Sequence, residues 1–269
     1  KWLSMVPALR EWVGPRQAKS LTTDSYTVRN IKYEGTLEVD RTELADDQTG
    51  QISMRIQDLA ARAASHKDYL LAQLFNNGGS AGYVGNDGAV FYSASHYGSQ
   101  DNDLTQAAAT GTEPTVAEMQ AALKACITAL GSFQDSTGQP YNTTLGPIII
   151  VTPPTSYYWT ALEAVGAGVM QYFTAGSAST ITTANPLAAL MPRVVTLPWI
   201  TDTDAIWVNI AGPGVRPFLF QDREPLEFVA LDNPDSPDVF HNDKYYYGVR
   251  ARYAITYGAW YRSCRCVFT

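Results

Sequence analysis

The chain has 269 residues, of which 45% are hydrophobic and only 17% charged, and its formal net charge is −7. This composition excludes an intrinsically disordered chain, and the acidic balance disfavours a sequence-reading nucleic-acid binder, which normally carries a basic face. No apolar run reaches the roughly 18 residues that a membrane-spanning helix needs. The low charged fraction predicts surface that other chains cover, and three cysteines, too few for a disulfide scaffold, indicate a reducing compartment.

The N-terminal region changes character near Tyr26. Residues 1–24 mix tryptophan, proline and basic residues without a period, which indicates an arm that packs on something else. From Tyr26 the chain alternates apolar and charged residues, which predicts an amphipathic strand and half of a hairpin that covers about residues 12–47. The expected apolar face carries Ile31, Tyr33, Leu37 and Val39.

A long helix is predicted over residues 51–77, where apolar residues recur at steps of three and four. At about 1.5 Å per residue it would be about 40 Å long, more than twice the usual globular helix. Asn77-Gly78-Gly79 should end it. A hairpin with a turn at Asn86-Asp87-Gly88 is expected over residues 82–92, and a polar loop over 98–113.

The middle of the chain, residues 113–221, reads as a compact α+β unit. Thr115 and Glu118 form a capping box before a helix that should end at Gly131. A buried strand is expected at 148–151, followed after two prolines by a helix through about Val165. The remaining elements predicted here are a flexible loop over 166–186 and strands over 194–200 and 206–210.

The C-terminal stretch alternates strictly, with Tyr, Val, Ala or Ile at every odd position from Tyr245 to Tyr261. At about 3.3 Å per residue this predicts a strand on the order of 60 Å long, whereas typical strands have about five or six residues. A helix and a strand that both outrun a domain of this size indicate a flat, extended subunit that neighbouring copies complete.

Motifs of common enzymes are missing from the sequence, including the phosphate-binding loop, the dinucleotide fingerprint and the nucleophile elbow. His66 is expected to be a packed or hydrogen-bonded residue. His96 follows a predicted strand, and no cysteine or serine nucleophile can be assigned to it from spacing alone. Residues 232–243, which include His241, form an acidic stretch that favours a solvated loop over a weak cation site. Cys264 and Cys266 would share a strand face and supply half a zinc site without a second pair, with Cys126 a core residue.

Aromatic residues are abundant, and many stand beside arginines. Stacking on single-stranded nucleic acid is one interpretation of this composition. The net charge favours the other interpretation, protein–protein contacts, in which tyrosine and arginine are enriched.

Several motifs follow one another along the chain in a specific order. They are Trp2-Leu3, Leu9-Arg10-Glu11-Trp12-Val13-Gly14-Pro15-Arg16, Tyr26-Thr27-Val28-Arg29-Asn30, Tyr33-Glu34-Gly35-Thr36-Leu37, Val39-Asp40-Arg41, Asp46-Asp47-Gln48-Thr49-Gly50, Ala63-Ala64-Ser65-His66-Lys67-Asp68, Gly85-Asn86-Asp87-Gly88, His96, Tyr247-Gly248-Val249-Arg250-Ala251-Arg252 and Tyr257-Gly258-Ala259-Trp260. In this order the motifs resemble the Mu-like phage major head subunit family. The resemblance covers the first hundred residues and the last thirty, while roughly 115–220 are generic.

The resemblance implies the α+β fold of tailed-phage major capsid proteins, called the HK-ninety-seven-type fold. It implies an N-terminal arm with an extended hairpin loop over 1–48 and an axial domain over 113–221. The peripheral domain, with its long spine helix and long strands, would then comprise 49–112 and 222–269.

The function implied is that of a major capsid protein, which self-assembles in pentamers and hexamers into the icosahedral shell of a virion. The shell would form in the cytoplasm of the host bacterium and contain double-stranded DNA without sequence-specific binding. Portal, scaffold or decoration proteins are further partners of such a shell, and no membrane, catalytic residue, cofactor or metal is expected. The expected intersubunit contacts are Trp12, Arg16, Lys32, Glu34, Arg41, Asp46 and Asp47.

Three alternatives stay open at the level of sequence. One is an encapsulin-like compartment, which would share the fold and enclose a cargo enzyme in place of DNA. Another is a hydrolase with a divalent ion at residues 232–243. The third adds a covalent cross-link between subunits, for which Lys32 and Glu34 are the only hairpin pair to consider, although an exposed ion pair would explain them as well.

Overall fold

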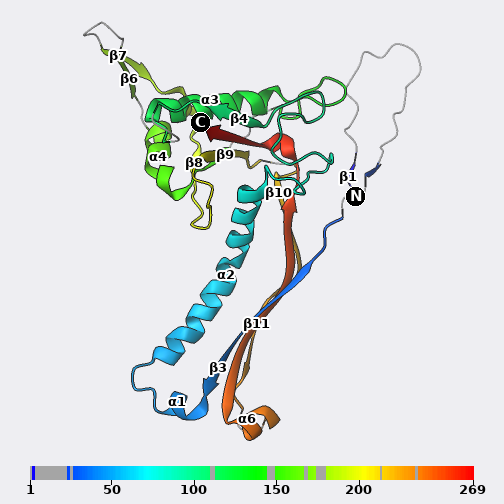
Figure 1. The fold of residues 1–269 in the computed structure, drawn as a ribbon, viewed down its shortest axis with the longest axis vertical. Coiled ribbons are helices and arrows are strands. Elements are labelled where there is room, and N and C mark those ends of the chain that lie inside the picture. Colours follow the sequence, from blue (N-terminus) through cyan, green and yellow to red (C-terminus); the bar gives the residue numbers. More distant parts are fainter. Residues whose placement is uncertain are drawn as a thin grey trace. The chain divides into compact units, whose positions relative to one another are not determined.

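The computed structural model describes residues 2–3, 23–24, 27–109, 113–143, 149–166, 169–173, 180–212, 214–233 and 236–269. Its contacts separate two compact units (Figure 1). Unit 1 contains residues 72–219 and 257–269, and unit 2 contains residues 27–71 and 220–256. This division differs from the predicted segments, because 72–112 and 257–269 group with the middle of the chain.

Unit 2 is built on a three-stranded sheet with the order β10-β11-β3. Its strands are β3 (Ile31–Asp40), β10 (Phe218–Leu231) and β11 (Lys244–Tyr257), of which β10 and β11 begin or end in unit 1. Strand β3 pairs antiparallel with β11, from Lys244 opposite Asp40 to Tyr253 opposite Ile31. The predicted strand is therefore confirmed, and its partner among the described residues is β11.

The hairpin predicted over 12–47 falls partly on residues that the structure does not describe. Alternation determines which face of a strand is apolar and leaves its partner open, so the pairing of β3 with β11 could not be predicted. Nearer the N-terminus, the two short strands β1 (Trp2–Leu3) and β2 (Thr23–Asp24) pair antiparallel. Residues 4–22 between them, which include Trp12 and Arg16, lie outside the described residues.

Helix α2 (Gln51–Asn77) runs beside the strands of unit 2 and confirms the predicted helix at both ends (Figure 1). Two short helices, α1 (Arg41–Ala45) and α6 (Pro237–Asn242), follow β3 and precede β11. The Asp47 carboxylate accepts hydrogen bonds from the amides of Thr49 and Ile52, both at 2.9 Å, and from the Thr49 hydroxyl at 2.8 Å. Asp47 therefore satisfies donors at the start of α2 that the helix itself leaves unpaired.

We expect the Asp47 contacts to depend on pH in the acid range. The amide of Ile52, and then the hydroxyl and amide of Thr49, lower the pKa of Asp47 from 3.8 to about 2. Because the folded-state pKa is the lower one, this stabilisation is complete above pH 3.8 and is lost as the pH falls through about 2. An NMR titration of the Asp47 carboxyl carbon should show this midpoint, and a midpoint near 4 would contradict the assignment.

Unit 1 is built on a five-stranded sheet with the order β4-β12-β9-β5-β8. Strand β12 is parallel to β4 and antiparallel to β9, and β5 is antiparallel to β9 and parallel to β8. Every residue of β9 is buried, so this strand forms the centre of the core. The strands are β4 (Asp103–Gln106), β5 (Ile149–Thr152), β8 (Arg193–Val194), β9 (Ala205–Ile210) and β12 (Ser263–Phe268).

Two predictions in this sheet were wrong. Strand β4 lies where a loop was expected, because its pairing with β12 and the bond from Arg265 to Asp103, at 2.6 and 2.7 Å, come from a segment far along the chain. Strand β8 overlaps the strand predicted over 194–200 only at Val194.

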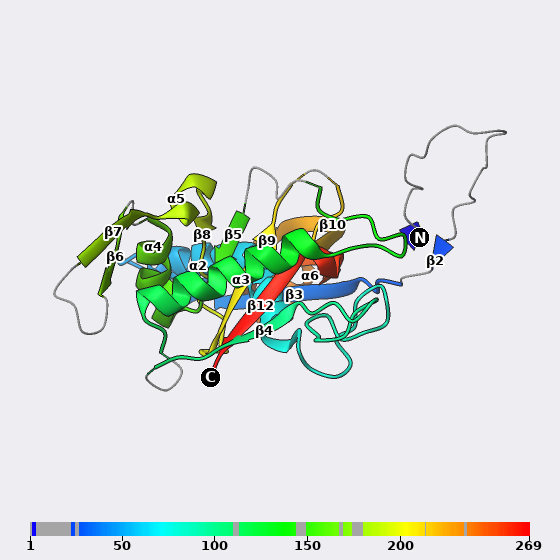
Figure 2. The same cartoon turned by 90° about the horizontal axis from the view of Figure 1, so that it is seen from above.

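The helices of unit 1 follow their local signals. Helix α3 (Val116–Ser132) begins with the predicted capping box of Thr115 and Glu118 and lies across the sheet (Figure 2). A 3₁₀ turn (Thr155–Tyr157) leads into α4 (Tyr158–Gly166), as expected after the prolines. The loop predicted over 166–186 contains an antiparallel pair, β6 (Val169–Phe173) and β7 (Thr180–Ala184), which precedes α5 (Pro186–Leu190).

The long C-terminal strand stops at Tyr257, although alternation continues to Tyr261. The Gly258 amide donates to the Pro217 carbonyl at 2.7 Å, and a 3₁₀ turn (Trp260–Arg262) follows before β12. A Cβ on residue 258 would lie 2.3 Å from the Arg216 carbonyl oxygen. Only glycine lets the two backbones approach this closely.

Replacing Gly258 with alanine should destabilise unit 1 by about 1–3 kcal/mol, because backbone atoms must move to admit the methyl group. Urea unfolding followed by fluorescence would measure the change. Gly212→Ala is the matched control, since a Cβ there has only ordinary contacts at 3.6 Å and beyond. Equal stability of the two variants would contradict the close approach at Gly258.

Candidate functional site

The candidate catalytic groups of unit 1 are packed inside the core. His96 is 3% exposed, its ring stacks on Trp260 with 4.1 Å between centroids, and its Nδ1 lies 2.6 Å from the Asp87 carboxylate. Its Nε2 lies 3.2 Å from the Phe91 carbonyl and 3.1 Å from the Asn102 side-chain oxygen. Both ring nitrogens of His96 thus contact protein groups, so His96 is a packed residue of the core.

The three cysteines are free and buried. The thiols of Cys126, Cys264 and Cys266 are neighbours, and this proximity together with burial raises the pKa of Cys126 and of Cys266. Such thiols stay protonated and are poor nucleophiles. Across the residues that the structure describes, no group of three or more His, Cys, Asp or Glu side chains is placed to hold a metal ion.

The acidic stretch over 232–243 contains helix α6, where a solvated loop was predicted. The Ser236 hydroxyl caps this helix by accepting from the Val239 amide, and Asp243 ends it and lies 3.7 Å from Arg41. His241 is exposed in its last turn. The Asp243 carboxylate is therefore used in an ion pair, while the helix is capped by the Ser236 hydroxyl and the Asp243 backbone amide.

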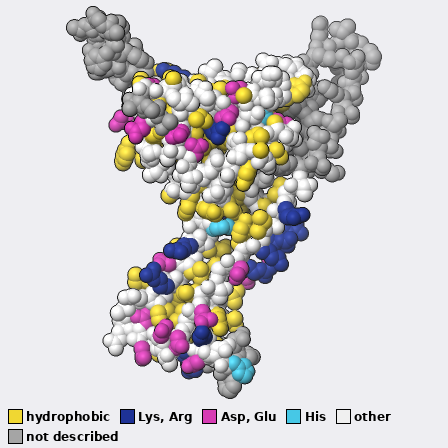
Figure 3. All heavy atoms as spheres, viewed as in Figure 1, with side chains coloured by type: hydrophobic (Ala, Val, Ile, Leu, Met, Phe, Trp, Pro, Cys, Tyr) yellow, Lys and Arg dark blue, Asp and Glu magenta, His cyan; other side chains and the backbone are white. Residues whose placement is uncertain are grey.

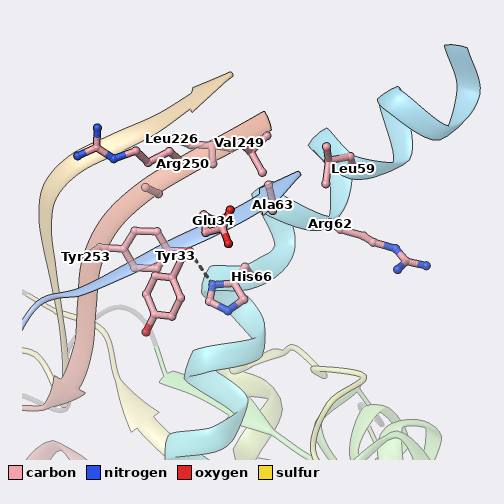
Figure 4. Close-up of a pocket in the computed structure, with 12 residues that line it drawn as sticks. Tyr33, Glu34, Leu59, Arg62, Ala63, His66, Leu226, Val249, Arg250 and Tyr253 are labelled. Atoms are coloured by element: carbon pink, nitrogen blue, oxygen red, sulfur yellow. Dashed lines mark hydrogen bonds between the residues drawn. The ribbon is translucent and has the colours of Figure 1, made fainter. Parts of the chain in front are cut away.

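A hollow of about 210 Å³ lies between α2 and the sheet of unit 2 (Figure 4). The His66 ring points from α2 toward the sheet, and its Nδ1 is 2.7 Å from the Tyr253 hydroxyl. The Tyr33 ring lies 4.5 Å from the His66 ring and 5.0 Å from the Tyr253 ring, measured between centroids. Apolar residues, among them Leu59, Leu226 and Val249, line the hollow together with the charged residues Glu34, Arg62 and Arg250.

The electrostatics of this hollow favour packing over proton transfer. Burial lowers the pKa of His66 and raises the pKa of Tyr33 and of Tyr253. All three groups are therefore held in their neutral forms near pH 7. Arg62 directs its guanidinium group away from the hollow (Figure 4). The arrangement is suited to receiving an apolar or aromatic side chain.

Strand β10 exposes a row of large apolar side chains that sequence reasoning missed. It is an edge strand of the unit 2 sheet, and β3 is the other edge. Pro225 within β10 and the apolar residues around it were the available signal, because proline within a sheet is confined largely to edge strands. The exposed residues are Phe220 (45%), Leu226 (40%), Phe228 (47%), Val229 (49%) and Leu231 (44%).

The expected contact residues on β3 are exposed charges. Lys32 lies opposite Arg252, and Glu34 lies opposite Arg250 and accepts a hydrogen bond from Thr36 at 3.3 Å. Lys32 and Glu34 share one face of the strand, two residues apart.

The other expected contacts divide into two groups. Arg41 and Asp46 are exposed around α1, while Asp47 binds the start of α2 and so also has a folding role. Trp12 and Arg16 lie outside the described residues. The structure thus brings Lys32 and Glu34 together on one strand, and Arg41, Asp46 and Asp47 together at the opposite end of that strand.

Membrane insertion of a helix is not indicated. Within the described residues, none of the helices combines the length and apolar character that a membrane crossing requires.

Comparison with known sequences identifies one family. Residues 1–120 and 201–266 match the profile described as "Mu-like prophage major head subunit gpT". The major capsid protein of Escherichia phage Mu is 32% identical over 77 residues, which are 29% of this chain and 25% of that protein. The Mu-like prophage FluMu major head subunit of Haemophilus influenzae is 30% identical over 95 residues, 35% of this chain and 30% of that protein. The matched segments thus span less than a third of either relative.

Comparison with solved structures identifies the fold. The mature capsid of bacteriophage PhiM1 matches with a TM-score of 0.59 at 13% identity, covering 99% of this chain and 80% of that one. The capsid of cyanophage P-SCSP1u matches with a TM-score of 0.59 at 8% identity, covering 99% and 81%. The fold is the α+β fold of tailed-phage capsids, the HK-ninety-seven type, as the resemblance implied.

Proposed function

Since the chain belongs to the Mu-like prophage major head subunit family, we propose that it is a major capsid protein whose copies assemble into the icosahedral shell around phage double-stranded DNA. The role is mechanical: the chain tiles a closed surface and resists pressure from within. This role requires surfaces on each copy that only another copy completes.

The observation that carries the proposal is the exposed edge of β10. An edge strand with unpaired backbone groups and several exposed large apolar side chains is a template for pairing with another chain, which natural proteins usually blunt or cover. Phe228, Val229 and Leu231 keep between 44% and 49% of their surface exposed. In an assembling subunit this surface is buried by a neighbour, by strand addition or by side-chain packing.

The expected organisation follows from symmetry. Heterologous contacts between identical copies form closed rings when the rotation from one copy to the next adds up to a full turn. Pentamers and hexamers would form through the axial region, proposed at 113–221, and the peripheral elements around α2, β10 and β11 would join neighbouring rings. Lys32, Glu34, Arg41 and Asp46 remain candidate contacts in these joints. Portal, scaffold and decoration proteins are further proposed partners of this shell.

The DNA would be contained without sequence-specific binding. The net charge of −7 suits a container, because a strongly basic lining would hold the DNA by counterion release. The protein would reside in the virion and be assembled in the cytoplasm of the host. The packed histidine and cysteines of unit 1 support a structural protein over a hydrolase.

Assembly of the purified full chain tests the proposal. Electron microscopy and sedimentation velocity should show closed shells, with nucleic acid as the copurifying material when they are made in infected cells. A solitary monomer at high concentration that turns over a small molecule would overturn it. Shells that enclose a protein cargo and no nucleic acid would favour the encapsulin-like alternative.

A further inference from the structure

Unit 2 carries an excess of cations where β3 begins (Figure 3). Arg252 lies directly opposite Lys32 on the neighbouring strand, and like charges in that position destabilise a sheet. Glu224 is shared by Arg250 at 2.6 Å and Arg252 at 3.5 Å. In the part of the chain that the structure describes, Lys32 and the exposed Arg29 have no ion-pair partner. We name this the basic end; it comprises Arg29, Lys32, Arg223, Arg250 and Arg252, with Asp222, Glu34 and Glu224 among them.

The opposite end of the same strands is acidic (Figure 3). Lys244 pairs with Glu38 and Arg41 with Asp243, which leaves carboxylates in excess. Glu43 and Asp46 are exposed, and no ion pair to either occurs among the described residues. We name this the acidic end; it comprises Glu38, Asp40, Arg41, Glu43, Asp46, Asp47, Asp232, Asp243 and Lys244.

The two ends cannot neutralise each other within one copy. Strand β3 runs from Ile31 to Asp40, a distance of roughly 30 Å at about 3.3 Å per residue. Exposed charges are largely screened beyond about 10 Å at roughly 0.1 M salt. Each unit 2 therefore presents two separate surfaces of opposite sign, which are complementary between copies.

We propose that the basic end of unit 2 in one copy binds the acidic end of unit 2 in a neighbouring copy. The contact is heterologous, so every copy binds one neighbour through its basic end and another through its acidic end. The contacts extend from copy to copy until the lattice closes. The inference rests on the proposed function and deepens it, because it assigns which surface of the subunit meets which.

A second copy fits the basic end better than the enclosed DNA does. Double-stranded DNA carries a phosphate charge about every 1.7 Å along its axis, so a bound duplex would be forced against Glu34 and Glu224. The acidic end offers separate carboxylates on short side chains, which can meet Arg29 and Lys32 without facing those two glutamates. Every copy carries one acidic end and one basic end, so the two surfaces are present in equal numbers.

Charge reversal at residues without a folding partner tests the proposal. R29E/K32E and E43K/D46K should each raise the concentration needed for assembly roughly tenfold in about 50 mM NaCl. The quadruple variant should assemble at a lower concentration than either double variant, because the reversed side chains at positions 29 and 32 and those at positions 43 and 46 again carry opposite charges. Light scattering and sedimentation velocity follow assembly, and circular dichroism confirms that each variant is folded.

Gln57→Glu on the exposed side of α2 is the matched control and should not change assembly. Normal assembly of both double variants would overturn the proposal, as would a quadruple variant no better than the doubles. Loss of DNA from R29E/K32E shells that assemble normally would also overturn it and assign the basic end to DNA. Failure of the unaltered chain to form shells would instead overturn the proposed function, and the inference with it.

Discussion

Replacing Phe228 and Val229 of β10 with lysine is expected to leave the subunit folded and to raise the concentration needed for shell assembly by about a hundredfold or more. Both side chains are almost half exposed in the single chain, at 47% and 49%, so folding loses little. At a subunit interface each lysine ammonium would be buried without a partner, which costs several kcal/mol. Each 1.4 kcal/mol of this cost weakens association by about tenfold. Sedimentation velocity across a concentration series measures the threshold.

The control for this variant places the same two lysines elsewhere in unit 2. Gln57 and Ala61 lie on the exposed side of α2, where lysine is well tolerated. Q57K/A61K should assemble at a concentration within about threefold of the unaltered chain. If the β10 variant assembled as readily as this control, the edge strand would not be a subunit contact.

Replacing Trp207 with alanine is expected to lower the free energy of unfolding by about 4 kcal/mol. The indole is fully buried on β9 at the centre of the unit 1 sheet and lies 5.3 Å from the Phe75 ring, measured between centroids. Its removal leaves a cavity that the surrounding strands cannot fill without distortion. Urea unfolding would give the change in free energy, and the melting temperature should fall by roughly 10 °C.

Trp159 provides the matched control, because its side chain is 71% exposed on α4. Trp159→Ala should change stability by no more than about 0.5 kcal/mol in the free subunit. A loss at Trp207 as small as the loss at Trp159 would contradict the position of β9 at the core centre.

The helices could be predicted from the sequence because their signals are local. Helix α2 matches its predicted bounds, since its apolar periodicity runs from Gln51 and stops before Gly78 and Gly79. Helix α3 matches because Thr115 and Glu118 cap it within four residues of chain. The packed state of His66 could also be anticipated, because it lies near the apolar side of its helix.

The sheets could be predicted only in part because strand pairing is not local. Strand β3 has the expected alternation, yet its partner β11 lies about two hundred residues away in the sequence. Strand β4 was missed because its order comes from β12 at the other end of the chain. Strand β10 was missed because Pro225 and charged residues interrupt its alternation, which a purely periodic signal requires.

The sequence predicted that charged residues form the candidate contact surface of unit 2, but not where on the sheet they lie. Lys32, Glu34 and Asp46 were expected to be contact residues on a hairpin. Nothing in the sequence indicated that the pairing of β3 with β11 puts a basic end and an acidic end on the sheet of unit 2. That polarity appears only when Arg250 and Arg252 are placed opposite Glu34 and Lys32. The family resemblance supplied the fold, while the register determined which ends of the sheet carry which charge.

Amide hydrogen exchange at β10, compared between free and assembled subunits, tests most directly whether neighbouring copies cover this strand. We expect the amides of residues 220–231 to exchange at least roughly tenfold more slowly in the shell, because a neighbour would bury or pair them. Equal exchange in free subunit and shell would show that β10 remains open after assembly. It would contradict the claim that neighbouring copies complete the sheet at this edge.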